Sequence, residues 1–440
     1  MPGSDPIVSS WGGTTAHARE LKSENLEAVT RSAVLTRGLG RSYGDSSLPP
    51  AGADSVASCV LADRILSFDE TTGALTAEAG LTIGEIQRLY LTRGWTFPVL
   101  PGTQFVTLGG AVASDIHAKN HQISGSVGHH VTALRIRLAD DRIVDCSRHE
   151  NESLFCATLG GMGLTGHILE VSFRLQRAPS PWIWGESERI GGLDEFIAAL
   201  RTSTDDWPFI VGWLDALSRG RWFGRGILIK GRWAEPDEAP REAPKPLRRL
   251  TVPLRFPDWA LNRFSVRLFN ELYFRKHPRK PKRGIVHPET FFHPLDGILH
   301  WNRIYGRRGF TQHQCVLSEP ERPGATQRYL EALTRLGLAS FLCVIKECGA
   351  EGEGMLSFPR PGISIAVDLP MRRDIQQVVD ELNELVLAEG GRIYLSKDTV
   401  TRAEHFRAME ERLDGFLVER RRWDPESRIR SAQSVRLFGD

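Results

Sequence analysis

The sequence predicts an α+β protein with two domains, and three observations support this fold class. The chain has 440 residues, more than one hydrophobic core usually holds. The first 180 residues combine short apolar strands with glycine-rich turns, and the composition changes at 177–181 (RAPSP). Beyond that point, strands alternate with amphipathic helices, as in a separate α+β unit.

Short strands with helices between them make up the first part of the chain. A helix is expected over 82–92, because apolar residues recur there at helical spacing and Thr82 with Glu85 matches a capping box. A second helix is expected over 152–159. The expected strands cover 33–35, 59–61, 74–78, 134–138 and 168–175.

Three glycine-rich stretches lie at the ends of expected strands. They are 37–45 (RGLGRSYGD), 101–121 (PGTQFVTLGGAVASDIHAKNH) and 159–166 (LGGMGLTG). Glycine lets the backbone approach a ligand closely, and successive free N–H groups form an anion-binding nest. Any one stretch could be an ordinary tight turn. Three in one predicted domain favour a cradle for a large cofactor that carries phosphate.

Residues 161–166 match the GxGxxG fingerprint of dinucleotide-binding folds, but their context does not. That fingerprint needs a strand before it and a helix after it, so that the pyrophosphate meets a helix N-terminus. Here an expected helix precedes the glycines and a strand follows them. The sequence therefore argues against a Rossmann domain and against a nicotinamide dehydrogenase.

The middle of the chain is rich in tryptophan and then in basic residues. Six tryptophans lie between 182 and 233, where large aromatic rings either build a core or line a cleft. Residues 234–249 are expected to form a solvated loop. Residues 263–283 carry eight Lys or Arg against one acid, Glu271, among aromatic and leucine side chains. Such a segment is either a solvated face or a surface that meets an anionic membrane.

The last part of the chain predicts a second run of strands and helices. Residues 310–370 read as a strand, a helix at 326–337 and two further strands. An amphipathic helix is expected over 374–389, a strand over 391–397, and helices in the charged tail that follows.

Composition and cysteine spacing limit the classes of function that the protein can have. A net charge of +2 without a basic stripe gives no indication of nucleic-acid binding. The six cysteines show neither CxxC nor zinc spacing, so we expect free thiols and no metal site. No secretory leader and no 18-residue apolar run is found. We therefore expect a cytoplasmic protein or one peripheral at the inner membrane, with the periplasmic face left open.

Several segments together resemble one branch of the vanillyl-alcohol oxidase superfamily, the decaprenylphosphoryl-β-D-ribose 2-oxidase family. The three glycine-rich stretches carry this resemblance, together with HPLDGILHWNRIYGRRGFTQHQ (293–314), LSFPRPG (356–362) and SKD (396–398). It runs from Trp11 to Asp424. It implies a two-subdomain, PCMH-type FAD-binding domain made of 1–180 and the C-terminal segment 391–440. A substrate-binding domain of 181–390 would be inserted between them.

The resemblance also implies which residues hold FAD. The loop 36–46 would wrap the pyrophosphate and ribose, with glycine N–H groups and the charge of Arg41 facing phosphate. Arg41 stands where many superfamily members have a histidine that bonds to the flavin, so we expect non-covalent FAD. The implied cofactor-binding residues are Arg37, Gly38, Leu39, Gly40, Arg41, Ser42, Tyr43, Gly44, Asp45, Gly102, Thr107, Gly109, Gly110, Ser114, His117, Gly166, Ile168 and Tyr394.

Oxidation of a secondary alcohol removes a hydride, which flavin takes, and a proton, which the protein must accept. The catalytic candidates that the resemblance implies are Lys397, His117 and Tyr43. A partly buried Lys397 would have a lowered pKa and could act as the base, and a water ordered by His117 stays an alternative. The candidates for binding substrate are Lys119 and Lys346, toward phosphate, and Gln312, Gln314, Arg303, Trp213 and Ser364, toward the sugar and pocket.

Three pocket positions depart from the mycobacterial pattern of the family. Ala366 stands where those members have a cysteine that traps nitroaromatic inhibitors. The cysteine is thought dispensable for turnover, so its loss does not argue against the reaction. Ser364 replaces an asparagine and Phe292 replaces a tyrosine, which leaves sugar and polyprenyl specificity open.

The resemblance implies oxidation of the C2 hydroxyl of a polyprenyl-phosphoryl-β-D-ribose to the 2-keto sugar. A separate NADH-dependent keto-reductase would complete the epimerisation to the arabinose donor of arabinan and cell-wall synthesis. Two alternatives stay open. One is a soluble sugar, alditol or aldonolactone oxidase of the same superfamily, and the other is a flavin-binding partner subunit without turnover.

Overall fold

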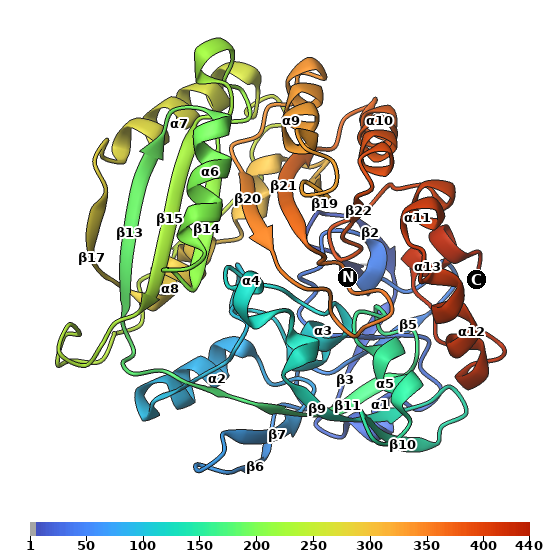
Figure 1. The fold of residues 1–440 in the computed structure, drawn as a ribbon. Coiled ribbons are helices and arrows are strands. Elements are labelled where there is room, and N and C mark those ends of the chain that lie inside the picture. The colour runs from blue at the N-terminus through green and yellow to red at the C-terminus, as the bar shows by residue number, and fades with distance from the viewer. Residues whose placement is uncertain (1–5) are drawn as a thin grey trace.

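The computed structural model describes residues 6–440 and is an α+β fold, as the sequence predicts. Two large antiparallel sheets, one of five strands and one of eight, form its framework (Figure 1). Figure 1 also shows the red C-terminal helices beside elements of the N-terminal part. No helix within residues 6–440 is both long and apolar enough to span a bilayer.

Two small sheets are formed by the first 60 residues. β1 (Ile7–Ser9) pairs with β2 (Thr15–His17), while β3 (Arg19–Lys22), β5 (Ser55–Ser58) and β4 (Thr36–Arg37) are parallel. The strands predicted at 33–35 and 59–61 are wrong by a few residues, because the chain turns at 30–33 and 59–62. Two short helical elements complete this region, α1 (Leu26–Val29) and η1 (Asp45–Ser47).

The five-stranded sheet belongs to the predicted N-terminal domain. Its order is β10 (Ile143–Ser147), β9 (Val131–Arg137), β11 (His167–Arg174), β7 (Ala74–Glu78) and β6 (Ile65–Phe68). α2 (Ile83–Tyr90) begins with the predicted capping box of Thr82 and Glu85. α5 (Glu152–Thr158) precedes residues 161–166 and β11 follows them, so the order that argues against a Rossmann domain is confirmed. The other elements here are η2 (Leu91–Arg93), β8 (Trp95–Thr96), α3 (Leu108–Ala113), α4 (His121–Ser124), η3 (Val127–His129) and β12 (Gln176–Arg177).

The eight-stranded sheet is built from the middle and last parts of the chain. Its order is β17 (Lys282–Val286), β13 (Ile183–Ile190), β15 (Gly226–Trp233), β14 (Phe209–Leu214), β20 (Cys343–Cys348), β21 (Gly362–Pro370), β19 (Phe310–Leu317) and β22 (Arg392–Ile393). Side chains alternate between the two faces of a strand. In β21, for example, residues of odd number and residues of even number face opposite sides.

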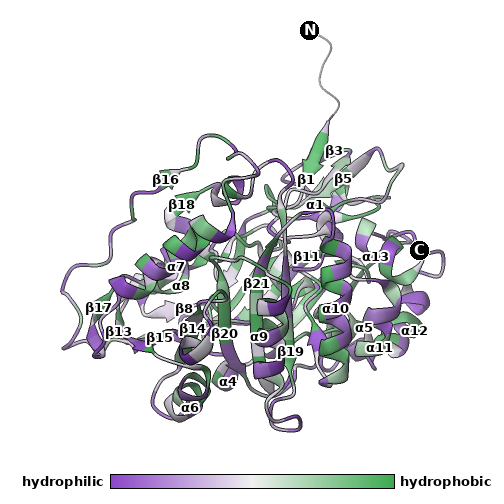
Figure 2. Cartoon of the chain, turned by 90° about the horizontal axis from the view of Figure 1, so that it is seen from above, coloured by the Kyte–Doolittle hydropathy of each residue, from purple (hydrophilic) through white to green (hydrophobic). Residues whose placement is uncertain are grey.

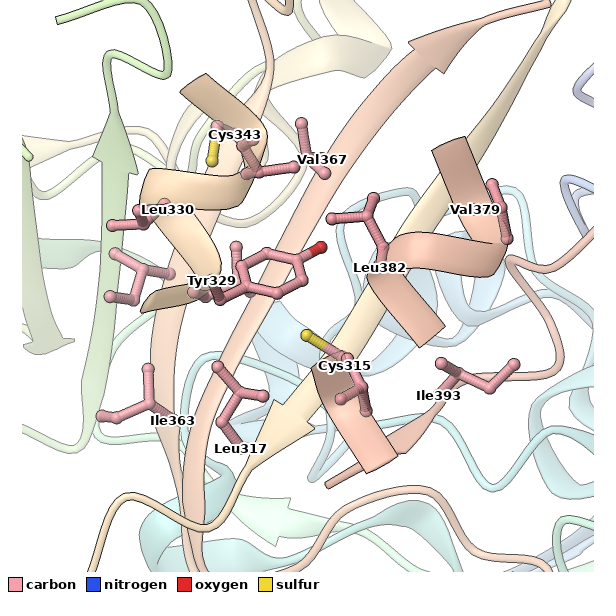
Figure 3. Close-up of a cluster of buried hydrophobic side chains, with 14 of the residues drawn as sticks. Cys315, Leu317, Tyr329, Leu330, Cys343, Ile363, Val367, Val379, Leu382 and Ile393 are labelled. Atoms are coloured by element: carbon pink, nitrogen blue, oxygen red, sulfur yellow. The ribbon is translucent and has the colours of Figure 1, made fainter. Parts of the chain in front are cut away.

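One face of this sheet is buried under α6 (Leu193–Ser203), α9 (Ala325–Arg335) and α10 (Ile375–Ala388). Figure 3 shows Tyr329 of α9 among Cys315, Ile363 and other apolar side chains of β19, β20 and β21. In Figure 2, α9 and α10 carry both hydrophilic and hydrophobic residues, as helices that cover a sheet do. Because the odd-numbered residues of β19 and β21 fill this core, their even-numbered residues point to the other face.

The residues around 234–310 form an edge region of the eight-stranded sheet. The predicted loop 234–249 has no helix or strand. The basic run is α7 (Arg263–Lys276) followed by β17. The remaining elements are η4 (Gly220–Trp222), β16 (Leu250–Thr251), α8 (Pro288–Phe292), η5 (Pro294–Gly297), β18 (Ile298–Leu299) and η6 (Trp301–Tyr305).

The C-terminal segment connects the two large sheets. β22 is shorter than the predicted strand at 391–397, because the chain turns at once and the Lys397 N–H donates to the Tyr394 carbonyl. α11 (Ala403–Met409), α12 (Leu413–Trp423) and α13 (Ala432–Phe438) follow. α12 packs on α5, and α13 packs on η1. These contacts support our proposal that residues 391–440 return to the domain formed by 1–180.

Candidate active site

A cavity of about 1230 Å³ lies between the glycine-rich stretches and the eight-stranded sheet. It exceeds the roughly 300–1,000 Å³ of common small-molecule pockets. The glycine-rich stretches line one part, the cavity face of β19, β20 and β21 lines a second, and α7 with β17 lines a third. The cavity therefore has room for a dinucleotide together with a second molecule.

The glycines of the first stretch pack the chain tightly. A Cβ at Gly44 would collide with the Asp398 carbonyl oxygen, and one at Gly38 would collide with the Thr107 hydroxyl. Gly102 serves differently, since a Cβ there would meet no atom within 4 Å and the residue lines the cavity. Glycine at Gly102 leaves room for a ligand to approach the backbone.

Several residues that line the same part of the cavity carry buried polar atoms without partners. The side chains of Arg37, Arg41, Ser46 and Ser47 line it, and each has at least one buried nitrogen or oxygen with no hydrogen-bond partner among the described residues. Buried polar groups are nearly always paired in folded proteins. These guanidinium and hydroxyl donors suit phosphate oxygens. The residues present thus fit the pyrophosphate of FAD.

Most of the predicted cofactor residues line the cavity, and two do not. Asp45 instead accepts hydrogen bonds from Arg436 at 2.9 and 2.8 Å, which ties the loop to α13. Gly44 packs against Asp398, so neither residue lines the cavity, and their contact with the cofactor stays a prediction. The lining members are Arg37, Gly38, Leu39, Gly40, Arg41, Ser42, Tyr43, Gly102, Thr107, Gly109, Gly110, Ser114, His117, Gly166, Ile168 and Tyr394.

Lys397 lies against Tyr43 in the cavity wall. Its Nζ is 3.9 Å from the centroid of the Tyr43 ring. Burial lowers the pKa of Lys397 to about 8; the carboxylate of Asp368 opposes this change and the charge of Lys346 adds to it. With this pKa, part of the Lys397 population is neutral near neutral pH, a property that a general base needs.

His117 is a neutral imidazole. Burial holds its pKa well below the usual value, and the charges of Lys346, His121 and Lys397 act in the same direction. The Gln314 amide nitrogen lies 2.9 Å from Nε2 and also donates to Ser364 Oγ at 3.3 Å. With that amide donating, Nε2 accepts and the proton is on Nδ1, which has no partner among residues 6–440. His117 can therefore donate a hydrogen bond to a ligand.

Two further lysines, Lys119 and Lys346, also line the cavity and can bring positive charge to it. Burial lowers the pKa of Lys119 to about 7 and that of Lys346 to about 8. Lys119 Nζ donates to the Phe291 carbonyl, and Lys346 Nζ donates to the Ala118 carbonyl at 3.2 Å. Within the described part of the chain, neither forms an ion pair with a carboxylate. The same residues hold no cluster of three His, Cys, Asp or Glu side chains that suits a metal ion.

The remaining substrate candidates divide into two groups. Gln312, Gln314, Trp213 and Ser364 line the cavity. Arg303 is not among the lining residues; its Nη1 donates to the Val252 and Pro253 carbonyls at 2.8 Å each, and its pocket role stays a prediction. Ala366 and Phe292, two of the departures from the family pattern, also line the cavity.

Sequence reasoning missed several lining residues. Ser47 directly follows the loop 36–46, and Gly163 lies within the stretch 159–166, so closer attention to these two motifs could have found both residues. Phe269 and Tyr273 of α7 could have been found from their spacing of four residues, which puts them on one face of a helix.

Comparison with known proteins identifies the family. The family described as FAD binding domain matches residues 23–147. The decaprenylphosphoryl-β-D-ribose oxidase of Mycolicibacterium smegmatis is 34% identical, over 99% of this chain and 98% of its own. An uncharacterized protein of Streptomyces coelicolor is 31% identical over 81% of this chain and 100% of its own. A putative D-arabinono-1,4-lactone oxidase of Neurospora crassa is 27% identical, but over only 38% of this chain and 32% of its own.

These similarities confirm the resemblance seen in the motifs. The cofactor is FAD, and the protein is an oxidoreductase. The near-complete coverage extends to the lysines and glutamines of the eight-stranded sheet, which lie outside the region matched by the FAD family. The chain belongs to the decaprenylphosphoryl-β-D-ribose oxidase family of FAD-dependent oxidases.

Proposed function

We propose that the protein oxidises the C2 hydroxyl of a polyprenyl-phosphoryl-β-D-ribose to the 2-keto sugar. The observation that carries this proposal is the charge of the cavity: Lys119, Lys346 and Lys397 line it, and none is ion-paired within residues 6–440. Buried charges are costly unless they are paired. A site of this kind favours a substrate that brings its own negative charge, and a sugar phosphodiester does so.

Each residue of the cavity wall has a separate role in the proposed reaction. Bound FAD would supply the hydride acceptor. Neutral Lys397 takes the proton of the C2 hydroxyl, and the Tyr43 ring holds its amine in place. His117 donates from Nδ1 to a sugar oxygen, while Gln314 keeps the imidazole oriented. Lys119 and Lys346 bind the phosphate, and its charge raises the pKa of both lysines again.

Apolar side chains in the lining of the cavity offer a surface for the lipid. Val211, Trp213 and Ile229 of the sheet line the cavity, and so do Phe269 and Tyr273 of α7; the Tyr273 ring lies 4.8 Å from the Trp213 ring. Isoprenoid chains are apolar and branched, so they gain free energy by leaving water for such a surface. This apolar lining supports a polyprenyl substrate over a free sugar, alditol or aldonolactone.

We also propose that α7 meets the surface of an anionic membrane. Phe264, Leu268 and Leu272 recur every four residues and form an exposed ridge; Phe264 is 78% exposed and Leu272 is 61% exposed. Figure 2 shows α7 with hydrophobic and hydrophilic residues side by side. Basic residues flank the ridge in sequence, at 275–283. An apolar ridge with a basic border is typical of interfacial helices.

Membrane contact can be measured by sedimentation with vesicles of phosphatidylglycerol and phosphatidylcholine. Glutamine at Arg275, Lys276, Arg279 and Lys280 should weaken binding, whereas the wild type should bind more as the phosphatidylglycerol fraction rises. A control removes four exposed arginines of the C-terminal segment instead, namely Arg407, Arg421, Arg422 and Arg428. Equal loss of binding in both variants, or none in either, contradicts a specific role for α7.

The proposed activity is tested by anaerobic reduction of the flavin. Farnesylphosphoryl-β-D-ribose should bleach the flavin absorbance, and free ribose, alditols and aldonolactones should not. Bleaching by free sugars alone would establish the soluble-oxidase alternative. Bleaching by none of them would favour a flavin-binding subunit without turnover.

The product requires a second enzyme. A 2-keto sugar becomes arabinose only when hydride returns to the opposite face of C2. We propose that a separate NADH-dependent keto-reductase supplies this step. Addition of a candidate reductase and NADH to the oxidation should then yield the arabinose epimer, detectable by chromatography of the released sugar.

A further inference from the structure

Asp368 is a buried carboxylate that the site described above does not use. It belongs to β21, where Ser364 and Ala366 line the cavity and alternate with core residues. Alternation puts Asp368 on the cavity face as well. It is 0% exposed and does not line the cavity, so it lies one layer behind the wall.

Neutral donors hold this carboxylate. The Tyr305 hydroxyl donates to Oδ2 at 2.8 Å, and the Gln312 amide donates to Oδ1 at 2.5 Å. Gln312 is also its cross-strand partner on β19. No ion pair to Asp368 is formed within residues 6–440. A fully buried carboxylate normally has a cationic partner, so an unpaired one behind a reaction site calls for a functional explanation.

Packed aromatic rings connect Asp368 to Lys397. The ring of Tyr305 stacks on Phe310 with 4.0 Å between centroids, and the Phe310 ring lies 5.2 Å from the Tyr43 ring, over which the Lys397 amine lies. Burial raises the pKa of Asp368 to about 7, while Tyr305, Gln312 and the charge of Lys397 each favour its ionised form. Burial and the Asp368 charge both raise the pKa of Tyr43, on whose ring the Lys397 amine lies. The interaction is reciprocal, because Asp368 favours the charged form of Lys397.

We propose that Asp368 is a positioning residue, whose carboxylate holds Gln312 in the wall and sets the charge state of Lys397 from behind it. It touches neither substrate nor cofactor and acts through its neighbours. The inference rests on the proposed role of Lys397 as proton acceptor. The titratable groups that face this pair are Tyr43 of the first glycine-rich stretch, His117 of the second, Tyr305 of η6, and Lys346 and Cys343 of β20.

The direction of the effect follows from Coulomb's law. An ionised Asp368 stabilises the cationic form of Lys397, so Asp368→Asn should lower the pH at which Lys397 loses its proton. Interactions between buried charges that are not in contact change such a midpoint by about half a unit to one unit. A purely structural role would change stability without moving this midpoint.

The test follows the protonation of Lys397 without any turnover. Holoenzyme is labelled briefly with cyanate across pH 6–10, and carbamylation of Lys397 is quantified by peptide mass spectrometry. The midpoint for Asp368→Asn should lie below that of the wild type by about half a unit or more. A matched control, Asp380→Asn, removes a carboxylate of α10 that pairs with Arg402, and should leave the midpoint unchanged.

A second variant covers the case in which Asp368→Asn does not fold. Tyr305→Phe keeps the carboxylate and removes one donor, so Asp368 stays protonated to higher pH and the Lys397 midpoint falls in the same direction. An unchanged midpoint in the folded variants overturns the proposal. Because labelling needs no substrate, its outcome is independent of the flavin-bleaching experiment, which alone decides the proposed activity.

Discussion

Replacement of Lys397 by methionine tests the centre of the proposed chemistry. Methionine keeps the length and apolar packing of the side chain against Tyr43 but cannot accept a proton. With a pKa of about 8, roughly one Lys397 in eleven is neutral at pH 7 and ten in eleven are neutral at pH 9. The rate constant of flavin reduction in the wild type should therefore rise about tenfold between these values.

The measurement is stopped-flow reduction of the flavin by farnesylphosphoryl-β-D-ribose across pH 6–10. Lys397→Met should lose about 10²–10⁴-fold in rate, the usual contribution of a general base, together with the rise around pH 8. Lys245→Met, at an exposed lysine of the loop 234–249, should match the wild type. A methionine variant that keeps the wild-type rate and pH profile refutes the assignment of Lys397 as base and favours a water ordered by His117.

Three further predictions concern the cofactor, an inhibitor class and stability. Acid precipitation should release all yellow colour into the supernatant, because Arg41 offers no covalent link to flavin; colour in the pellet contradicts this. Nitroaromatic inhibitors should leave no mass adduct at Ala366, whereas Ala366→Cys should acquire one. Burial lowers the pKa of His167 and His313 to about 4, so protons bind preferentially to the unfolded chain below the ordinary histidine value. The free energy of unfolding, measured in urea, should thus fall as pH decreases from 6.5 toward 4, and a flat profile there would contradict the assignment.

Local features of the sequence predict local structure well. The capping box of α2 and the helix before residues 161–166 are as predicted, because capping and helical periodicity depend on residues within a few positions of each other. The motifs predict the cofactor too, since close backbone approach to phosphate needs glycine at defined positions. Strand ends are less accurate, as the shortened β22 shows, because pairing partners decide where a strand stops.

The site depends on contacts between distant parts of the chain. Asp45 pairs with Arg436, 391 positions away, and this contact links the first glycine-rich stretch to α13. Arg303 donates hydrogen bonds to the backbone carbonyls of Val252 and Pro253, a contact that no sequence motif predicts. In both cases the motif gives the type of residue, but the packing of the chain decides which partner its side chain contacts.

By itself, the sequence determined the α+β class from periodicity and a cradle for a phosphate-bearing cofactor from its glycine-rich stretches. The family, the identity of the cofactor as FAD and the candidate lysines followed from the resemblance that the motifs carry. Only the tertiary structure decided which of those side chains share one cavity, and which charges remain unpaired there. The face of β21 illustrates the reason. Alternation along the strand places Ser364, Ala366 and Asp368 on one face, and the sequence shows that much. Only the tertiary structure shows that α9 and α10 bury the opposite face, so that this face is directed toward the cavity.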